Sequence, residues 1–157
     1  MTATIHDGSY ETIPDSASEG LVLLKAFLPL LDSLNNALPQ IRTFVVETAK
    51  FVINRDAPVT LEELLEMLEM RGKMLQVFRH DVTRAWEIQG ESGATVIFES
   101  ESTTQFKGDD VQVKVAEMNV WELRRDGRTS ALKLSEARCW MDPSAVQRRA
   151  KEVFGKK

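Results

Sequence analysis

Two polar residues interrupt an apolar register in the second half of the chain, and their side chains could carry chemistry. From Val111 to Leu123 the alternate positions are apolar, except for Glu117 and Asn119. Alternate residues of a strand share one face, and the covered face of a sheet should be apolar throughout. A buried polar group without a partner costs about 1–3 kcal/mol. Glu117 and Asn119 therefore indicate a cavity that is lined by polar groups.

The preceding segment turns polar midway in the same manner. Its inner register reads Val96, Phe98, Ser100, Ser102, Thr104 and Phe106, so hydroxyl groups occupy the middle of an apolar face. Two neighbouring strands with this break predict a small-molecule pocket, whose ligand would contact Phe98, Ser100, Ser102, Thr104 and Trp121. Two alternatives stay open: a wet but inert interior in which Glu117 pairs with an arginine, and a polar dimer interface.

General acid–base chemistry is what these residues could perform. Glu117 is the candidate acid or base, and desolvation in an apolar pocket should raise its pKa toward neutrality. Asn119 and the three hydroxyl groups would orient a substrate oxygen or stabilise developing negative charge. The reaction would begin with proton abstraction next to a carbonyl and continue as isomerisation, cyclisation or loss of water, without a cofactor.

Two further residues are candidates, each with a structural alternative. His80 could be an acid–base group, but the face of its strand is open, because either His80 and Val82 or Thr83 and Ala85 could point inward. Cys139 could line the pocket or belong to the core. No cluster of histidine and cysteine has metal-ligand spacing, so no metal site is predicted.

The elements that must position these residues follow from periodicity and capping signals. Residues 1–15 read as a flexible tail, and residues 16–157 as one domain. Helices are predicted from a capping box at 16–19 through 31, from 38 to 46, from a second capping box at 60–63 through 78, and after Asp142-Pro143. Strands are predicted at 50–53, 80–89, 95–107, 111–125 and 130–141. Short turns between the long strands predict an antiparallel meander, and hence an α+β fold.

Composition limits the partners. The chain has 157 residues, 43% of them hydrophobic, and a net charge of −4, which argues against nucleic acid. Its most apolar run, 21–31, contains Lys25 and is too short to span a membrane. The single cysteine, Cys139, and the lack of a signal peptide predict a cytoplasmic protein.

The element order resembles the nuclear transport factor 2-like superfamily, and within it the SnoaL-like proteins. The match extends from about Leu21 to Pro143 and is most specific at EMNVWEL, residues 117–123, and EARCWMDP, residues 136–143. FRHDVTRAW, residues 78–86, is similar to uncharacterised fungal members. The resemblance implies N-terminal helices packed on a strongly curved antiparallel sheet, a cystatin-like fold with a cone-shaped pocket.

The resemblance also implies a range of functions. This superfold hosts polyketide cyclases, isomerases, dehydratases and proteins without catalysis. Asn119 resembles the position of a hydrogen-bond-donating acid in ketosteroid isomerases. The end of the short strand, at Ile53 or Asn54, resembles the place of their catalytic base, but no carboxylate stands there. The expected ligand is a hydrophobic, oxygenated polyketide or terpenoid, and homodimers are expected through the outer sheet face, with Trp86 and Trp140. A non-catalytic binding or dimerisation module is the alternative.

Overall fold

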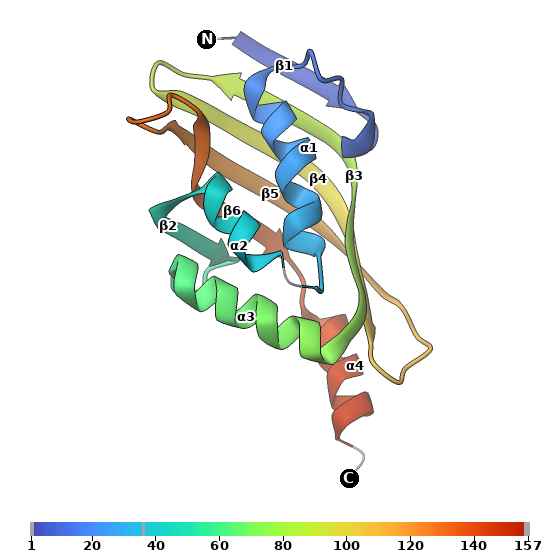
Figure 1. Cartoon of the computed structure of the whole chain (residues 1–157). Coiled ribbons are helices and arrows are strands. Elements are labelled where there is room, and N and C mark those ends of the chain that lie inside the picture. Colours follow the sequence, from blue (N-terminus) through green and yellow to red (C-terminus); the bar gives the residue numbers. More distant parts are fainter. Residues whose placement is uncertain (1, 36, 156–157) are drawn as a thin grey trace.

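The computed structural model describes residues 2–35 and 37–155, and within them the chain forms helices packed against a single sheet (Figure 1). The helices are α1 (Glu19–Asp32), α2 (Leu38–Phe44), α3 (Leu61–Met74) and α4 (Ser144–Phe154), with a short 3-10 turn at Tyr10–Thr12. The strands are β1 (Thr2–Asp7), β2 (Val45–Ile53), β3 (Leu75–Gln89), β4 (Gly93–Phe106), β5 (Val113–Arg125) and β6 (Leu132–Met141). The predicted α+β class is confirmed.

The sheet is a meander extended at both edges. Its order is β1-β3-β4-β5-β6-β2, with every neighbouring pair antiparallel except β2 and β6, which run parallel. Helices α1, α2 and α3 lie on one side of the curved sheet, and α4 projects from its far end (Figure 1). The core fills the space beneath α1, where Phe27 stacks on Phe44 and meets Trp121.

Helix α1 begins differently from the prediction. The residue before it is Ser18, whose hydroxyl makes no capping bond, so the proposed capping box at 16–19 is wrong. The Glu87 carboxylate of β3 instead accepts a hydrogen bond of 3.0 Å from the Leu21 backbone N–H. A buried carboxylate at a helix N-terminus is favourable, because it satisfies a free donor and faces the positive end of the helix dipole. The helix continues through Pro29 to Asp32 without dividing.

Helix α3 begins as predicted and ends earlier. Its capping box is confirmed, since the Thr60 hydroxyl accepts from the Glu63 N–H and the Glu63 carboxylate accepts from the Thr60 N–H. The predicted helix to residue 78 is wrong beyond Met74, because Leu75 and the residues after it pair with β4. The apolar residues Leu75 and Phe78 fit the end of an apolar helix stripe, and they fit the start of a half-buried strand equally well.

The N-terminal segment carries regular structure at Thr2–Asp7 and Tyr10–Thr12, within the range where the sequence predicted a flexible tail, residues 1–15. Residues 2–7 form β1 and pair in antiparallel register with residues 84–89 of β3. Ile13 anchors the following turn, with 1% of its surface exposed. This segment is stabilised by backbone hydrogen bonds to the edge of β3 and by the burial of Ile13, although its composition suggested mobility.

A bulge in β3 settles the face of that strand. The register with β4 shifts between Val82 and Arg84, so Thr83 is an extra residue. His80 and Val82 therefore face the helices, and beyond the bulge Ala85 and Glu87 do so. The first alternative is thus correct for His80 and Val82, whereas of the second pair only Ala85 faces inward, since Thr83 is exposed.

Candidate functional site

A cavity of about 300 Å³ lies between α3 and the inner face of the sheet. Helix α3 contributes Leu64, Met67, Leu68 and Arg71, and the strands contribute, among others, Phe51, Phe78, His80, Glu117, Asn119, Trp121 and Cys139. The walls are mainly apolar, with a few polar groups that converge at one side. Apolar walls with a few placed polar groups are typical of small-molecule sites, which measure roughly 300–1,000 Å³.

His80 is held between two carboxylates at the wall of this cavity. Asp32, the last residue of α1, lies 2.6 Å from His80 Nδ1, and its other oxygen accepts a 2.7 Å bond from the His80 backbone N–H. On the opposite side, His80 Nε2 lies 2.9 Å from Glu117 Oε2. This second contact has ion-pair distance, and the buried Glu117 Oε2 has no further hydrogen-bond partner among the described residues.

His80 and Glu117 meet across an intervening strand, because β4 lies between β3 and β5. Neighbouring strands are roughly 4.8 Å apart, so the two backbones are separated by about 10 Å. Ser102 stands opposite His80, and Ser100 stands opposite Glu117. Their small side chains leave room for the imidazole and the carboxylate to approach each other above β4. The hydroxyl residues at the centre of the inner face thus have a steric as well as a polar role.

The charges of this cluster are coupled. Burial lowers the pKa of His80, but hydrogen bonding to Asp32 and contact with Glu117 outweigh that effect and raise the pKa to about 9. Burial raises the pKa of Glu117, but the His80 cation, with smaller contributions from Ser102 and Asn119, brings it below the usual range. The predicted upward shift of Glu117 is therefore wrong in direction. With a pKa of about 9, His80 is an imidazolium at neutral pH, held between the side chains of Asp32 and Glu117.

Asn119 lies beside this cluster and lines the cavity. Its Nδ2 donates a 3.0 Å hydrogen bond to the Ser100 hydroxyl, which uses one of the two amide hydrogens. Ser100, Ser102 and Thr104 are buried but do not line the cavity, so they form a polar layer behind it. Their direct contact with a ligand stays a prediction.

The remaining predicted residues divide into two groups. Trp121 and Cys139 line the cavity. Burial raises the pKa of the Cys139 thiol to about 12. Phe98 is core, packed edge-on against Trp121 with ring centroids 5.1 Å apart. Asn54 does not line the cavity: at a φ of 54° it turns the chain after β2, and its side-chain oxygen accepts a 2.9 Å bond from the Met141 N–H.

Sequence reasoning missed Asp32 and Arg71, although each leaves a local signal. Asp32 is a carboxylate in the last turn of α1, where the helix dipole disfavours negative charge, so its presence there suggests another purpose. Arg71 stands three residues after Leu68 on the apolar stripe of α3, so a cation interrupts an inward face. Neither signal identifies His80 as the common neighbour.

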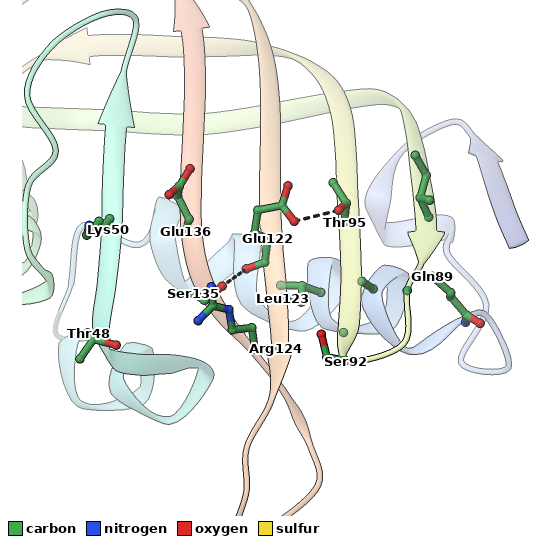
Figure 2. A pocket seen from close by; sticks show the side chains of 14 residues that line it. Thr48, Lys50, Gln89, Ser92, Thr95, Glu122, Leu123, Arg124, Ser135 and Glu136 are labelled. Carbon is green, nitrogen blue, oxygen red and sulfur yellow. Dashed lines mark hydrogen bonds between the residues drawn. The ribbon is translucent and has the colours of Figure 1, made fainter. Parts of the chain in front are cut away.

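A second hollow, of about 690 Å³, lies on the opposite face of the sheet (Figure 2). Its lining includes Lys50 of β2, Glu136 of β6 and Glu122 of β5, whose carboxylate accepts a 2.8 Å bond from Thr95. Glu122 and Lys50 are exposed to solvent, where charges interact weakly. The smaller cavity is the better candidate site because two of its ionisable groups, His80 and Glu117, are shielded from solvent and face each other.

Two structural findings bear on metals and membranes. Among residues 2–35 and 37–155, no group of three or more His, Cys, Asp or Glu side chains has an arrangement that could hold a metal ion. None of the helices in the described part of the chain has the length and apolarity that a membrane crossing requires.

Comparisons with known proteins give a consistent answer on architecture. No family model and no curated protein sequence matches the chain. Solved structures do match. PrhC from Penicillium brasilianum is 11% identical, with a TM-score of 0.66 over 87% of this chain and 88% of that one. A ketosteroid isomerase-like protein from Erwinia carotovora is 13% identical, with a TM-score of 0.64 over 82% of this chain and 98% of that one.

An NTF2-like protein with a cystatin-like fold from Novosphingobium aromaticivorans is a third match. It is 15% identical, with a TM-score of 0.63 over 84% of this chain and 85% of that chain. Identities this low establish architecture and not activity. With its helices on one face of a curved meander and its cavity beneath α3, the chain has the nuclear transport factor 2-like fold.

Proposed function

We propose that this chain is a cofactor-independent isomerase, cyclase or dehydratase that acts on a hydrophobic, oxygenated small molecule of the polyketide or terpenoid type. The observation that carries the proposal is the buried Asp32–His80–Glu117 cluster at the wall of an apolar cavity. Ionisable groups with perturbed pKa values inside a cavity are typical of acid–base sites. A chain with one cysteine fits a reducing, cytoplasmic compartment.

The cluster supplies an acid and a base in contact with each other. In a dehydration, the Glu117 carboxylate takes a proton from the carbon next to the substrate carbonyl. The electrons of that C–H bond form a C=C bond as the C–O bond of the leaving hydroxyl breaks. His80 gives its Nε2 proton to the leaving oxygen, and water departs.

The same contact restores the resting state. After one turnover Glu117 is protonated and His80 is neutral, and a proton transfer across their 2.9 Å contact returns both to their starting forms. In an isomerisation the abstracted proton returns to a different carbon. A base with a low pKa suffices when the developing oxygen charge is stabilised, and we assign that stabilisation to the Asn119 amide, which lines the cavity.

Hydrogen–deuterium exchange tests this chemistry before the natural substrate is known. A panel of cyclic ketones and β-hydroxy ketones is incubated with the protein in D₂O, and mass spectrometry measures deuterium uptake next to the carbonyl. We expect the wild type to accelerate uptake and Glu117→Gln to lose about 100-fold or more of that rate. Glu101→Gln, an outer-face carboxylate paired with Lys114, is the matched control. Equal uptake in Glu117→Gln and wild type would refute Glu117 as the base.

A non-catalytic binding or dimerisation module is the second candidate, favoured by an apolar patch on the outer sheet face. Met118 and Trp140 are register partners there, with 37% and 40% of their surfaces exposed, and Val120, Ile97 and Trp86 continue the patch across the sheet. A two-fold interface would place this patch against its copy, so a homodimer is proposed. Sedimentation of Trp140→Glu tests it: a monomer beside a dimeric wild type supports the interface, and an unchanged mass rejects it.

A further inference from the structure

A guanidinium inside the cavity lacks an anionic partner. Arg71 of α3 lines the cavity, and no carboxylate of the described residues lies within ion-pair distance of it. Its Nη2 donates to the Leu31 carbonyl, and its Nε is buried without an acceptor. Arg138, which also lines the cavity, is paired with Glu136. Arg71 is therefore distinguished by its missing counter-ion rather than by its position alone.

The surroundings of Arg71 make its charge costly. Its guanidinium carbon stands 4.1 Å from the centre of the Phe78 ring, and the adjoining cavity walls are apolar. Desolvation lowers the pKa of Arg71 to about 10, and the more distant Asp32 charge offsets only part of that effect. A buried cation without a paired anion destabilises a fold, and an arriving carboxylate would remove that cost while forming charge-assisted hydrogen bonds.

Arg71 is also positioned relative to the acid–base cluster. The Phe78 ring contacts the guanidinium on its face and the His80 ring edge-on, with Phe78 and His80 centroids 5.2 Å apart. A group bound at Arg71 would therefore sit one aromatic ring away from the imidazole. The ligand would therefore carry its anionic group at Arg71 and present a different part, the reacting carbon, to Glu117.

We infer that Arg71 binds a carboxylate of the ligand, so that the cavity takes hydrophobic carboxylic acids. This inference extends the proposed function by naming a substrate class, and it concerns binding alone. A purely structural role for Arg71 competes with it, because the bond to Leu31 satisfies a carbonyl at the C-terminal end of α1. The structural role predicts no preference between charged and neutral ligands.

Matched ligand pairs separate the two roles. Calorimetry at neutral pH compares naphthylacetate with naphthylacetamide, and cyclohexylacetate with cyclohexylacetamide. We expect the wild type to bind the carboxylate of at least one pair about tenfold or more tightly than the amide, as charge-assisted hydrogen bonds imply. Arg71→Met should reduce this ratio to near one, whereas Arg79→Gln, at an exposed arginine that is paired with Asp81 and lies outside the cavity lining, should leave it unchanged. A ratio that survives Arg71→Met, or a wild type that prefers neither ligand, would overturn the inference.

Two measurements keep the test decisive if Arg71→Met unfolds. Arg71→Lys retains the charge and should keep part of the preference. In the wild type, the Arg71 Nε–H resonance should move when naphthylacetate is added and stay in place with naphthylacetamide, whereas a purely structural arginine would respond to neither. Glu117→Gln should retain the carboxylate preference, so that failure of the proposed chemistry and failure of the binding assignment give different results.

Discussion

The Asp32→Asn variant tests the central cluster most directly, because it removes one charge from His80 and keeps the shape of the side chain. The His80 ring and the Asp32 carboxylate are 15% and 10% exposed, so solvent screens their contact weakly. The folded-state pKa of His80, about 9, lies about 2.5 units above its ordinary value of 6.5. At about 1.36 kcal/mol per unit, the cluster favours the protonated folded protein by about 3 kcal/mol.

The sign of the pH dependence follows from the direction of this shift. A pKa raised in the folded state adds stability that is fully present below about pH 6.5 and is lost as the pH rises through about 9. Removing the Asp32 charge should lower the pKa of His80 by about 1–3 units. The stability of Asp32→Asn should therefore fall short of the wild type by about 1–4 kcal/mol at pH 6, and by less at pH 9. Loss of the imidazolium at neutral pH should also reduce the acid-dependent turnover proposed above.

Two assays measure these quantities. An NMR titration of the histidine ring protons gives the pKa of His80. The only other histidine is His6, and the spectrum of His80→Gln, which lacks the His80 signal, shows which resonance is which. Urea unfolding at several pH values gives the free energy of unfolding. Asp81→Asn is the matched control, since Asp81 is exposed on the same strand and pairs with Arg79. A wild-type His80 that titrates at or below 6.5, or an unchanged pKa in Asp32→Asn, would refute the reasoning.

Two further predictions concern stability and reactivity. Glu87→Ala should lower the free energy of unfolding by about 2 kcal/mol, because it removes the 3.0 Å hydrogen bond that the buried Glu87 side chain accepts from the Leu21 N–H. Thermal denaturation measures this loss of stability, and a change within about 0.5 kcal/mol would contradict the capping role. Burial raises the pKa of the Cys139 thiol from 9 to about 12, so iodoacetamide at pH 8 should alkylate Cys139 at least about a hundredfold more slowly than a free thiol. Alkylation of the folded protein at the free-thiol rate would contradict the burial of Cys139.

Local sequence determined the framework of the fold. Period-two alternation located β4, β5 and β6 to within about two residues, because every second side chain had to face one core. The same alternation identified Glu117 and Asn119 as inward-facing polar residues, and both line the cavity. The Thr60 capping box depends on residues three positions apart and was equally readable. These features involve neighbours in the chain, whose relative geometry is fixed by the element they form.

Tertiary structure decided the features that depend on distant partners. Asp32 and His80 are 48 residues apart, and no local pattern pairs them. The Thr83 bulge exists because β3 must match β4 on both sides of it, and it placed His80 inward where alternation alone left two choices. The N-terminus of α1 is capped from 66 residues away by Glu87, which overrode a plausible local capping box. A sequence pattern specifies which face of an element is buried, but the partner of a buried charge is set only when elements pack.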